Sequence, residues 1–564
     1  MIIGLDVGGT HTDVVLLGKN GLENRVKVLT DTTDLFTTVL AGIERITANI
    51  DPHQITHIVL STTLTTNAIA EGKLPPVGMI VTCGPGIHPD NFRVGSHFHL
   101  VRGGIDHSGR EIQPIDDEQV KAVAGMMAAE GIRYVGVVGK FSSRNPAHET
   151  RIANLIAPMF EKVFSGHRTS GNFSFPRRIA TTFLNASIYP VHRNFFEAVK
   201  SSLRQKGFTI PIYILKADGG TMDFESSIDF PGQSILSGPA ASVMGSIAFA
   251  RESTETIVLD IGGTTTDMAV LIDRVPVLAP SGIEIHNYKT LIRALHTESV
   301  GLGGDSRVRV RGDRLTIGPD RMGPAMAYGG PAPTPTDALF VLGKATDGDV
   351  ENARKGIREI AAALGISEKA AAYKIFDQTC REILVKARQM VDRINSKPVY
   401  TVREALEGHR INPDHLLVLG GPAPYFAEHF QSISDYTVEK VPQWDVANAI
   451  GTGLSRTTCE VTLFADTYQG QAAAPEEMFV EAIHPRFSVG EASRMAHDLL
   501  MKKAMKAGAN PDDMETDVLE ELEFNMIRNF RHTGRLIRIR LQVRPGLIKD
   551  YQQITRNLDG RKAN

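Results

Sequence analysis

One short sequence occurs twice in this chain, and this repeat limits what the chain can fold into. Residues 5–13 read LDVGGTHTD and residues 259–267 read LDIGGTTTD. Each copy runs from an apolar strand through an acid, two glycines, hydroxyl residues and a second acid into another apolar strand. Because glycine accepts positive φ without a steric penalty, each copy predicts a β-hairpin with a tight turn. The repeat therefore predicts two corresponding α/β units.

A turn of this kind suits an anion. Backbone N–H groups without neighbouring side chains, together with threonine hydroxyls, form a cradle for phosphate. An acid at the strand end can hold hydrated Mg²⁺, which prefers carboxylates, waters and phosphate oxygens, and Asp6 and Asp260 occupy this place. Asp13 and Asp267 either take part in that chemistry or only orient the returning strand. A plain turn also explains one copy, but two facing hairpins can clamp both ends of a triphosphate.

A third glycine turn follows the apolar sequence HLLVL. Gly420 and Gly421 lie between this strand and a helical start, where small residues let an adenine ring approach the backbone. An ordinary strand-to-helix turn is the alternative. The sequence contains no GxxxxGK[ST] loop, and no GxGxxG opens a helix after the first strand. The hairpins are therefore the candidates for the phosphate contacts.

The rest of the sequence is typical of a globular α/β protein. At 564 residues, with 42% hydrophobic and 22% charged residues, the chain predicts two or three domains. Strand-like runs alternate with helical patterns, which indicates largely parallel sheets. The net charge of −3 gives no support for nucleic-acid binding. Three widely spaced cysteines, no membrane-length apolar run and no secretory leader favour a cytoplasmic protein without a membrane partner.

The sequence pattern changes along the chain. We expect a long helix within residues 178–207, an irregular stretch with one hairpin at 274–349, and helices at 350–402. After residue 463 the sequence is charged and predicts helices, ending in RLIRIRLQV as an edge strand. The expected parts are an N-terminal lobe of residues 1–185, a second lobe of residues 186–462 and a mostly helical C-terminal extension of residues 463–564.

Eight strings, in order, resemble the hydantoinase/oxoprolinase family, which includes the HyuA-type ATPase subunits. They reach to about residue 453 and read GLDVGGTHTDVVLL, STTLTTNAIAEGK, RRIATTFLNASIYP, ADGGTM, LSGPAASVMGS, LDIGGTTTDMAVL, ESVGLGGDS and IGPDRMGPAMAYGGPAPTPTDALFVLG. Two phosphate hairpins followed by a nucleoside turn also resemble the actin, sugar-kinase and Hsp70 ATPase superfold. The resemblance implies a two-lobed α/β fold with ribonuclease H-like lobes and ATP in the cleft between them.

For function, the resemblance implies ATP-dependent work on an unreactive carbonyl group. The main interpretation is a hydrolase that opens a cyclic amide of the hydantoin or 5-oxoproline type through a phosphorylated carbonyl, with ATP and Mg²⁺ as cofactors. The alternatives are the ATP-using subunit of an acetone- or acetophenone-type carboxylase and a reactivating or chaperone-type ATPase of the same superfold. A small-molecule kinase is disfavoured because ESVGLGGDS and SGPAAS match the hydantoinase group. The resemblance also implies a second, HyuB-like subunit, and we expect an oligomer.

The resemblance assigns residues to the site. Asp6, Asp260 and Asp305 are the expected catalytic carboxylates, and Asp6 and Asp260 are also the expected metal ligands. The expected nucleotide contacts are Gly8, Gly9, Thr10, Thr12, Gly262, Gly263, Thr264, Thr265, Gly303, Gly304, Gly420 and Gly421. Asp305 stands where the family pattern has another glycine, so it could bind metal, act as a base or cap the next segment. His11 replaces an aromatic residue that relatives commonly carry.

Other candidate residues have simpler explanations. His97 and His99 would share one face of a strand and could bind a metal, but exposed or structural histidines show the same spacing. Lys73 could contact a phosphate or substrate, or could end a solvated helix. Cys83 lacks an identifiable base that would make it a nucleophile. The sequence leaves the roles of both histidines open.

Overall fold

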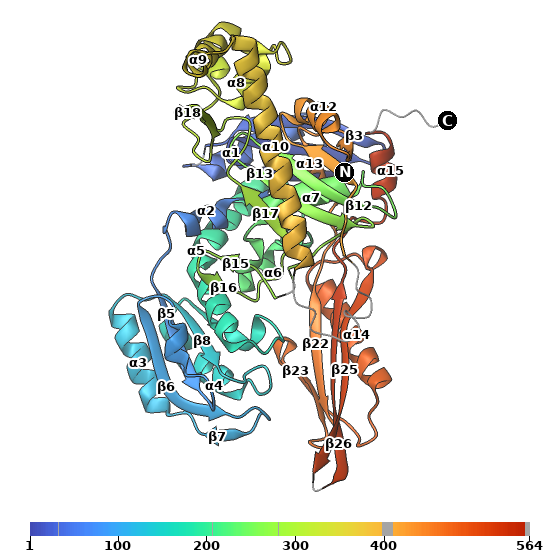
Figure 1. The fold of residues 1–564 in the computed structure, drawn as a ribbon. Helices are drawn as coiled ribbons and strands as arrows, with labels where there is room; N and C mark the ends of the chain where they lie inside the picture. Colours follow the sequence, from blue (N-terminus) through green and yellow to red (C-terminus); the bar gives the residue numbers. More distant parts are fainter. Residues whose placement is uncertain (32, 206, 280, 397–409, 529, 559–564) are drawn as a thin grey trace.

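The computed structural model describes the whole chain except residues 32, 206, 280, 397–409, 529 and 559–564. Four main sheets organise the fold. In the view of Figure 1, two of them lie in the upper half, a third lies at the lower left and the fourth at the lower right. Within the described residues no helix combines the length and apolar character needed to cross a membrane. The mixed α/β architecture agrees with the fold class expected from the sequence.

The first sheet carries the first copy of the repeat. Its strand order is β11 (Thr221–Asp223), β10 (Ile212–Leu215), β4 (His57–Thr62), β1 (Ile2–Val7), β2 (His11–Gly18) and β3 (Gly21–Leu29). β1, β4 and β10 run parallel, whereas β1 and β2 are antiparallel. Helices α1 (Leu35–Thr47) and α5 (Phe175–Gln205) pack on the sheet through Val39, Ile43 and Phe196. The parallel strands therefore end together at one edge.

The second sheet repeats this plan around the second copy. Its strand order is β14 (Val275–Pro276), β13 (Thr266–Ile272), β12 (Glu255–Ile261), β20 (His415–Leu419) and β21 (Thr437–Lys440), and β17 (Thr297–Val300) also pairs with β13. β12 and β20 are parallel, and β12 and β13 form the hairpin. The two sheets thus place the repeated hairpins in equivalent positions.

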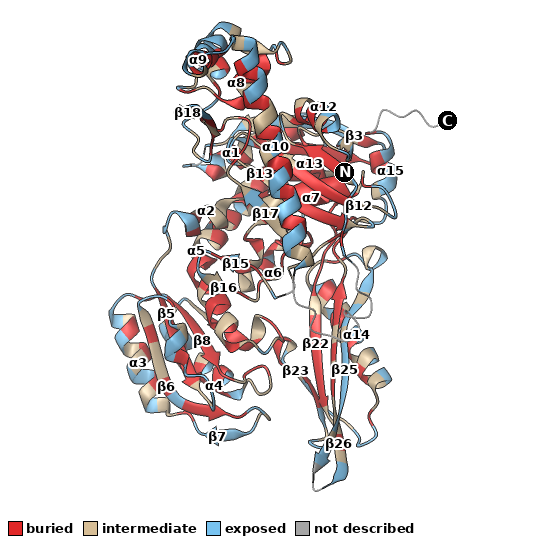
Figure 2. Cartoon of the chain, viewed as in Figure 1, coloured by how far each residue is buried: buried red, intermediate tan, exposed pale blue. Residues whose placement is uncertain are grey.

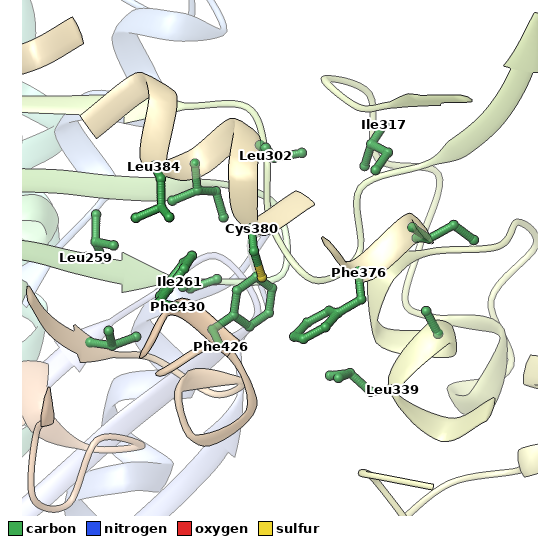
Figure 3. Packing of buried hydrophobic residues seen from close by; sticks show 14 of the residues in the cluster. Leu259, Ile261, Leu302, Ile317, Leu339, Phe376, Cys380, Leu384, Phe426 and Phe430 are labelled. Atoms are coloured by element: carbon green, nitrogen blue, oxygen red, sulfur yellow. The ribbon is translucent and has the colours of Figure 1, made fainter. Parts of the chain in front are cut away.

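A helix that is buried along one face packs on the second sheet. Phe376, Cys380 and Leu384 are spaced by four residues on α10 (Glu368–Asn395), so they lie on one helix face. Figure 3 shows them in one cluster with Leu259 and Ile261 of β12. Phe426 and Phe430 of α12 (Ala423–Ile433) complete this cluster. The core therefore fixes the strand that leads into the second hairpin.

Two helices of small residues join the sheets. α7 (Ser237–Ile247) and α13 (Ala447–Leu454) cross at backbone contact: a Cβ on Gly451 would lie 2.1 Å from the backbone nitrogen of Gly245. α13 approaches the first sheet equally closely, since a Cβ on Gly4 would lie 2.1 Å from the carbonyl oxygen of Ala449. Glycine at these positions permits an approach that any side chain would block. The two sheets consequently share one core between them.

In Figure 1 the other two main sheets lie below the first and second sheets. The third sheet has the order β7 (Glu111–Gln113), β6 (His97–Ile105), β5 (Val77–Cys83), β8 (Tyr134–Gly139) and β9 (Lys162–Ser165). The fourth has the order β24 (Phe479–Ala482), β23 (Gln471–Ala474), β22 (Glu460–Asp466), β26 (Arg531–Val543) and β25 (Thr516–Arg528). Other helices include α2 (Leu64–Ala70), α3 (Asp117–Ala129), α4 (Ala147–Ile156), α6 (Phe224–Asp229), α8 (Pro335–Val341), α9 (Val350–Leu364), α14 (Val489–Lys506) and α15 (Tyr551–Arg556).

The expectation of a mostly helical C-terminal extension is wrong. This region is a five-stranded antiparallel sheet with one long helix, α14, on it. β25 is rich in Glu and Leu, which favour helix in isolation. Pairing with β26 overrides that propensity, because Glu520 and Glu523 form cross-strand ion pairs with Arg538 and Arg535. RLIRIRLQV is a strand as expected, but it lies between β22 and β25 and is not an edge strand.

The structure contains the expected hairpin and helices of the middle region, but the expected domain boundaries fall inside secondary-structure elements. The hairpin within 274–349 is confirmed as β18 (Val308–Arg311) and β19 (Arg314–Ile317), and helices α9 and α10 confirm the helical segment as far as residue 396, residues 397–402 lying outside the described residues. The expected boundary at 185/186 falls inside α5, and β10 and β11, which follow it, complete the first sheet. The boundary at 462/463 falls inside β22. Sheets assembled from distant strands explain why linear boundaries do not separate them.

Candidate functional site

The repeated sequences form two equivalent hairpins, as expected. In the first, Asp6 on β1 lies opposite Asp13 on β2, and in the second, Asp260 on β12 lies opposite Asp267 on β13. The acids therefore occupy the same register position in both sheets, one residue pair before the turn.

The two turns also share one hydrogen bond. The N–H of Gly8 donates to the carbonyl of His11 at 3.1 Å, and the N–H of Gly262 donates to the carbonyl of Thr265 at 2.9 Å. A Cβ on Gly9 would meet no atom within 4 Å, so the first tip borders open space. All residues of the two tips are exposed or half-buried: Gly8, Gly9, Thr10 and His11 in the first and Gly262, Gly263, Thr264 and Thr265 in the second. Both tips can therefore present backbone and hydroxyl groups to a ligand.

Asp6, Asp13 and Asp267 all lie within electrostatic reach of Asp260. The charges of Asp13 and Asp260 both raise the pKa of Asp6, and Asp260 also raises those of Asp13 and Asp267. Asn448, on α13, donates to Oδ2 of Asp260 at 3.0 Å, and its hydrogen bond also acts on the pKa of Asp6. Asn448 therefore bonds Asp260 and lies near enough to Asp6 to act on its pKa, so the carboxyl ends of β1 and β12 lie close together.

Asp6 is the most perturbed of these acids. Burial raises its pKa to about 7, and the charges of Asp13 and Asp260 act in the same direction, whereas the nearby polar groups of Ser61 and Asn448 act against it. Its Oδ1 is buried and accepts no hydrogen bond within the described part of the chain. A buried oxygen without a partner costs free energy. A cation bound there would remove both penalties.

The other acids have clearer partners. Burial raises the pKa of Asp267 to about 6. Burial also raises the pKa of Asp13, although Lys27 on β3 lies 2.5 Å from its carboxylate. Ser242 on α7 donates to Oδ2 of Asp260 at 2.5 Å. The sequence reasoning missed Ser61, Lys27, Ser242 and Asn448. Ser61 and Ser242 had a signal, because they lie in the strings STTLTTNAIAEGK and LSGPAASVMGS.

The loop of residues 303–305 lies directly on the second hairpin. The N–H of Gly304 donates to the carbonyl of Gly262 at 2.9 Å, and the N–H of Asp305 donates to the carbonyl of Gly263 at 2.7 Å. A Cβ on Gly303 would lie 2.5 Å from the carbonyl oxygen of Gly262. Only glycine permits this approach. The glycines of ESVGLGGDS are therefore needed for the loop to pack on the hairpin.

Asp305 is held by several neighbours. Arg321 donates to its Oδ2 at 3.0 Å, and the hydroxyl of Thr336 lies 3.4 Å from its Oδ1. The same Oδ2 would lie 2.6 Å from a Cβ on Gly263. The side chain therefore packs on the tip of the second hairpin and ties it to the irregular segment that carries Arg321 and Thr336.

The third glycine turn lies beside Asp260. Gly420 has φ of 93°, and a Cβ there would lie 2.6 Å from Oδ1 of Asp260 and 2.3 Å from the carbonyl oxygen of Ile261. Gly421 borders open space. A Cβ on Gly304 would be 3.8 Å from Pro422, which brings the turn and the loop of residues 303–305 together. The turn at residues 420–421 and the loop of residues 303–305 therefore both lie against the second hairpin.

Thr12 differs from the expectation. Its side chain is fully buried and its hydroxyl lies 2.9 Å from that of Thr30. The corresponding Thr266 is equally buried and donates to the carbonyl of Leu302 at 2.7 Å. These hydroxyls anchor the hairpins to other segments of the same chain, at Thr30 and Leu302, and are not free to reach a phosphate. Sequence alone could not separate them from the exposed threonines at the tips.

The remaining candidates do not form a second reactive site. The Nδ1 of His97 lies 3.0 Å from Glu130, and burial lowers the pKa of His99. Lys73 is exposed and forms an ion pair with Glu71. Burial raises the pKa of the Cys83 thiol, which opposes a nucleophilic role. Over the described ranges, no group of three or more His, Cys, Asp or Glu side chains could by itself hold a metal ion.

Two family profiles match the chain. The hydantoinase/oxoprolinase profile matches residues 178–461, and the profile of the hydantoinase/oxoprolinase N-terminal region matches residues 2–160. Together they include both hairpins, the loop of residues 303–305 and the turn at residues 420–421.

Two named relatives are similar to this chain over about two thirds of its length. The gamma subunit of acetophenone carboxylase from Aromatoleum aromaticum is 28% identical over 427 residues, which are 65% of this chain and 57% of the relative. Caprolactamase subunit alpha from Pseudomonas jessenii is 26% identical over 419 residues, 66% of this chain and 60% of the relative. The chain thus spans about three fifths of the length of these curated relatives.

A solved structure has the same fold. The crystal structure of the ATP-dependent caprolactamase from Pseudomonas jessenii superposes with a TM-score of 0.70 at 20% sequence identity, over 98% of this chain and 88% of that chain. The likeness extends beyond the lobes to the C-terminal sheet, because it covers nearly the whole chain.

Proposed function

Because the chain belongs to the hydantoinase/oxoprolinase family, we propose that it is an ATP-dependent enzyme that opens a cyclic amide of the hydantoin or 5-oxoproline type. The amide oxygen attacks the γ-phosphorus, and the bond to ADP breaks. One water adds to the phosphorylated carbonyl carbon, the bond to the ring nitrogen breaks, and an acyl phosphate forms. A second water hydrolyses the acyl phosphate to the acid and phosphate. The sum is cyclic amide, ATP and two waters giving the ring-opened amino acid, ADP and phosphate. Caprolactamase subunit alpha, a similar protein, bears the name of a cyclic-amide hydrolase.

One observation carries this proposal: equivalent acids from the two hairpins meet at Asn448 between the lobes. Two cradles that face one point suit a ligand with charge at both ends, as a triphosphate has. In this proposal Gly8, Gly9 and Thr10 contact one end of the triphosphate. Gly262, Gly263, Thr264 and Thr265 contact the other, and Gly420 and Gly421 border the nucleoside. Phosphoryl transfer asks mainly for this positioning and for charge neutralisation.

Magnesium fits the same point. Mg²⁺ is commonly held by one or two carboxylates together with waters and phosphate oxygens. Asp6 offers a buried oxygen without a hydrogen-bond partner in the described structure, and Asp260 lies within electrostatic reach of it. The absence of a larger ligand cluster among the described residues agrees with a metal that arrives with its nucleotide. When bound, the ion would neutralise charge on the phosphates.

We assign Asp305 a positioning role. Its carboxylate is engaged by Arg321 and packs on Gly263, so it holds the loop of residues 303–305 against the second hairpin. A base would need a free oxygen directed at the substrate. Replacing Asp305 by Asn should therefore weaken ATP binding more than it lowers kcat at saturating ATP.

A ketone carboxylase subunit is the second candidate. The gamma subunit of acetophenone carboxylase is about as similar to this chain as the caprolactamase subunit is. Both chemistries need an activated carbonyl or enolate oxygen, so the phosphate cradles serve either. The two candidates differ only in the co-substrate that consumes the activated intermediate.

A partner subunit belongs to both proposals, since both relatives are named as subunits. The edge strand β25 exposes large apolar side chains, and Figure 2 shows the far end of the β25–β26 hairpin as largely exposed. Those side chains are Val518, Leu519, Leu522, Phe524 and Ile527. An exposed apolar edge strand is a template for association with another chain. We place the partner there.

The test is phosphate release from Mg-ATP by the purified chain. Hydantoin, 5-oxoproline and caprolactam form one panel, and acetone and acetophenone with bicarbonate form the other. Stimulation by a cyclic amide, with a ring-opened product, supports the first proposal. Stimulation only by a ketone with bicarbonate contradicts it in favour of the second. If ATP binds but neither panel stimulates turnover, the measurement is repeated with the chain that co-purifies from its native host.

A further inference from the structure

A separate pocket of about 290 Å³ lies beside the C-terminal sheet. Its walls come from the turn between β10 and β11, the helix α5, the beginning of β22 and the helix α14. In Figure 1 this is the region where α5 and α6 approach β22 and α14. A pocket of this size lies near the lower end of the range for small-molecule sites.

Arg293 supplies donors that nothing in the pocket uses. All three guanidinium nitrogens are buried, and none makes a hydrogen bond within the described structure. The nearest carboxylate oxygens stand at 3.5 Å on Asp218 and 3.7 Å on Glu460. Both oxygens accept hydrogen bonds from other groups, the hydroxyl of Thr458 and the guanidinium of Arg540. The planar fork of Arg293 is therefore held in place by charge while its N–H groups remain available.

Glu476, which also lines the pocket, has a second group without a hydrogen bond in the described structure. Its side chain is buried, with the whole residue 6% exposed. Oε1 accepts from the backbone N–H of Thr462 at 2.8 Å, whereas Oε2 has no hydrogen-bond partner among the described residues. Burial raises the pKa of this carboxyl to about 7. Near neutral pH the free oxygen can accordingly either accept or donate a hydrogen bond.

The charges of the pocket argue against an anion. The lining contains seven acids, Asp218, Asp223, Glu225, Asp229, Glu460, Glu476 and Glu477, and five cations, Arg168, Lys216, Arg293, Lys503 and Lys506. The buried lysines are already paired: Lys216 with Asp218 and Lys503 with Glu477. No excess positive charge remains to attract phosphate. The unused fork and carboxyl instead suit a neutral molecule that presents a carbonyl oxygen and an N–H.

The pocket shares a sheet edge with the candidate phosphate site. Lys216 and Asp218 follow the carboxyl end of β10, which is separated from β1 by β4 alone, and all three strands are parallel. Two strand spacings place the ends of β10 and β1 about 10 Å apart. Gln233 lines the pocket, and Ser237, four residues later, bonds the backbone of Thr62 at the end of β4. The two sites are thus neighbours along one edge.

We propose that this pocket binds a small neutral cyclic amide, whose carbonyl oxygen accepts from Arg293 and whose N–H faces Glu476. The substrate class rests on the proposed function, whereas the location rests on the unused groups of the pocket. In this assignment the two residues are binding residues of the amide, and the nucleotide site does not depend on them.

The test measures amide binding separately from ATP binding. Saturation-transfer NMR with the neutral amides hydantoin and caprolactam, each without nucleotide, compares the full chain with Arg293→Gln and Glu476→Gln. We expect at least about a tenfold loss of affinity in each variant, the size of one lost charge-assisted or buried hydrogen bond. Arg309→Gln is the matched control, because Arg309 is a half-buried arginine on β18 that pairs with Asp320 away from the pocket. The affinity of Arg309→Gln for each amide should equal that of the wild type.

The outcomes separate the two proposals. In the phosphate-release assay, Arg293→Gln should raise KM for the amide and leave KM for ATP unchanged. An amide that stimulates turnover with the same KM in wild type and Arg293→Gln overturns the pocket while the proposed function stands. If the wild type binds no amide but turns over ATP with a ketone and bicarbonate, the proposed function fails and the pocket assignment fails with it. Normal melting temperatures in both variants establish that lost binding is not unfolding.

Discussion

The two hairpins share sequence and register but differ in what surrounds them. The tip of the first borders open space at Gly9, whereas a Cβ on Gly263 at the tip of the second would lie 2.6 Å from the carboxylate of Asp305. The backbone of the second tip also accepts hydrogen bonds from Gly304 and Asp305. One sequence therefore gives an open cradle and a covered cradle, because the covering loop comes from elsewhere in the chain.

The acids at the strand ends differ in the same way. Asp260 accepts hydrogen bonds from Ser242 and Asn448, so its carboxylate is fixed. Asp6 keeps a buried oxygen without a hydrogen bond in the part of the chain that is described, and its pKa is about 7. We infer that the two hairpins have different roles. The covered hairpin holds its ligand in place, and the open hairpin has the acid that still lacks a counter-ion.

Loss of an acid should have the largest effect. Asp6→Asn and Asp260→Asn are each expected to lower turnover of Mg-ATP by at least about 100-fold, since each removes charge from the proposed metal site. Asp13→Asn is the control, because Asp13 already pairs with Lys27, and it should lose less than about tenfold. Phosphate release gives the rates, and circular dichroism checks the fold. Wild-type turnover in both strand-end variants would show that the hairpins are not phosphate cradles.

The perturbed pKa of Asp6 predicts a pH dependence of stability. Its pKa is about 7 in the folded chain against an ordinary value of 3.8, so between these values the folded state holds a proton that the unfolded state releases. Without metal or nucleotide, the free energy of unfolding should therefore fall as pH rises through this window. Asp6→Asn removes the penalty, and it should melt roughly 2 °C or more above wild type at pH 8.

The control for this experiment is a lower pH. At pH 4.5 the difference in melting temperature between the variant and the wild type should be much smaller than at pH 8, because pH 4.5 lies close to the ordinary pKa of 3.8 at which the difference disappears. Asp267, whose pKa is about 6, leaves a smaller dependence of the same sign in the variant. Adding Mg-ATP at pH 8 should raise the melting temperature of the wild type more than that of Asp6→Asn. A variant that melts below wild type at pH 8 would contradict the burial argument.

A methyl group placed on each tip tests the covering loop. Gly263→Ala forces the carboxylate of Asp305 away from Arg321 and should cost about 1–2 kcal/mol of unfolding free energy. Gly9→Ala meets no atom and should cost less than about 0.5 kcal/mol. Urea denaturation without nucleotide measures both. Adding Asp305→Ala to Gly263→Ala should recover part of the loss, and strict additivity of the two changes would rule out the proposed contact.

The buried threonines should give the smallest difference. Thr266→Val leaves the carbonyl of buried Leu302 without its donor and should cost about 1–2 kcal/mol. Thr12→Val removes a bond to Thr30, which is half-buried and can turn to water, so about 0.5–1 kcal/mol is expected. Both variants should keep the KM for ATP of the wild type. A large rise in that KM for Thr12→Val would restore this residue as a phosphate contact.

Local chemistry explains which elements were predictable. The hairpins follow from two glycines between apolar strands, and the third turn follows from Gly420, whose φ of 93° favours glycine. The strand RLIRIRLQV follows from its alternation, with Ile537, Ile539 and Leu541 buried. The helical expectation for β25 failed because cross-strand partners, which propensity does not contain, decide its state.

The site was predictable only in part for the same reason. Asp6, Asp260 and the glycines stand inside a recognisable pattern, but Asn448 lies in α13 with no pattern of its own. Thr12 and Thr10 are two residues apart and chemically equal, yet only Thr12 points into the protein. Alternation along a strand separates them once the register is known.

The sequence by itself determined the two hairpins, their acids and the family, because these depend on residues that are neighbours along the chain. Only the tertiary structure decided that the acids meet at Asn448, that residues 303–305 cover one hairpin and leave the other open, and that Arg293 and Glu476 line one pocket. Those facts depend on which distant segments pack together. Burial then sets the pKa of Asp6, because desolvation acts on the place a side chain occupies in the fold.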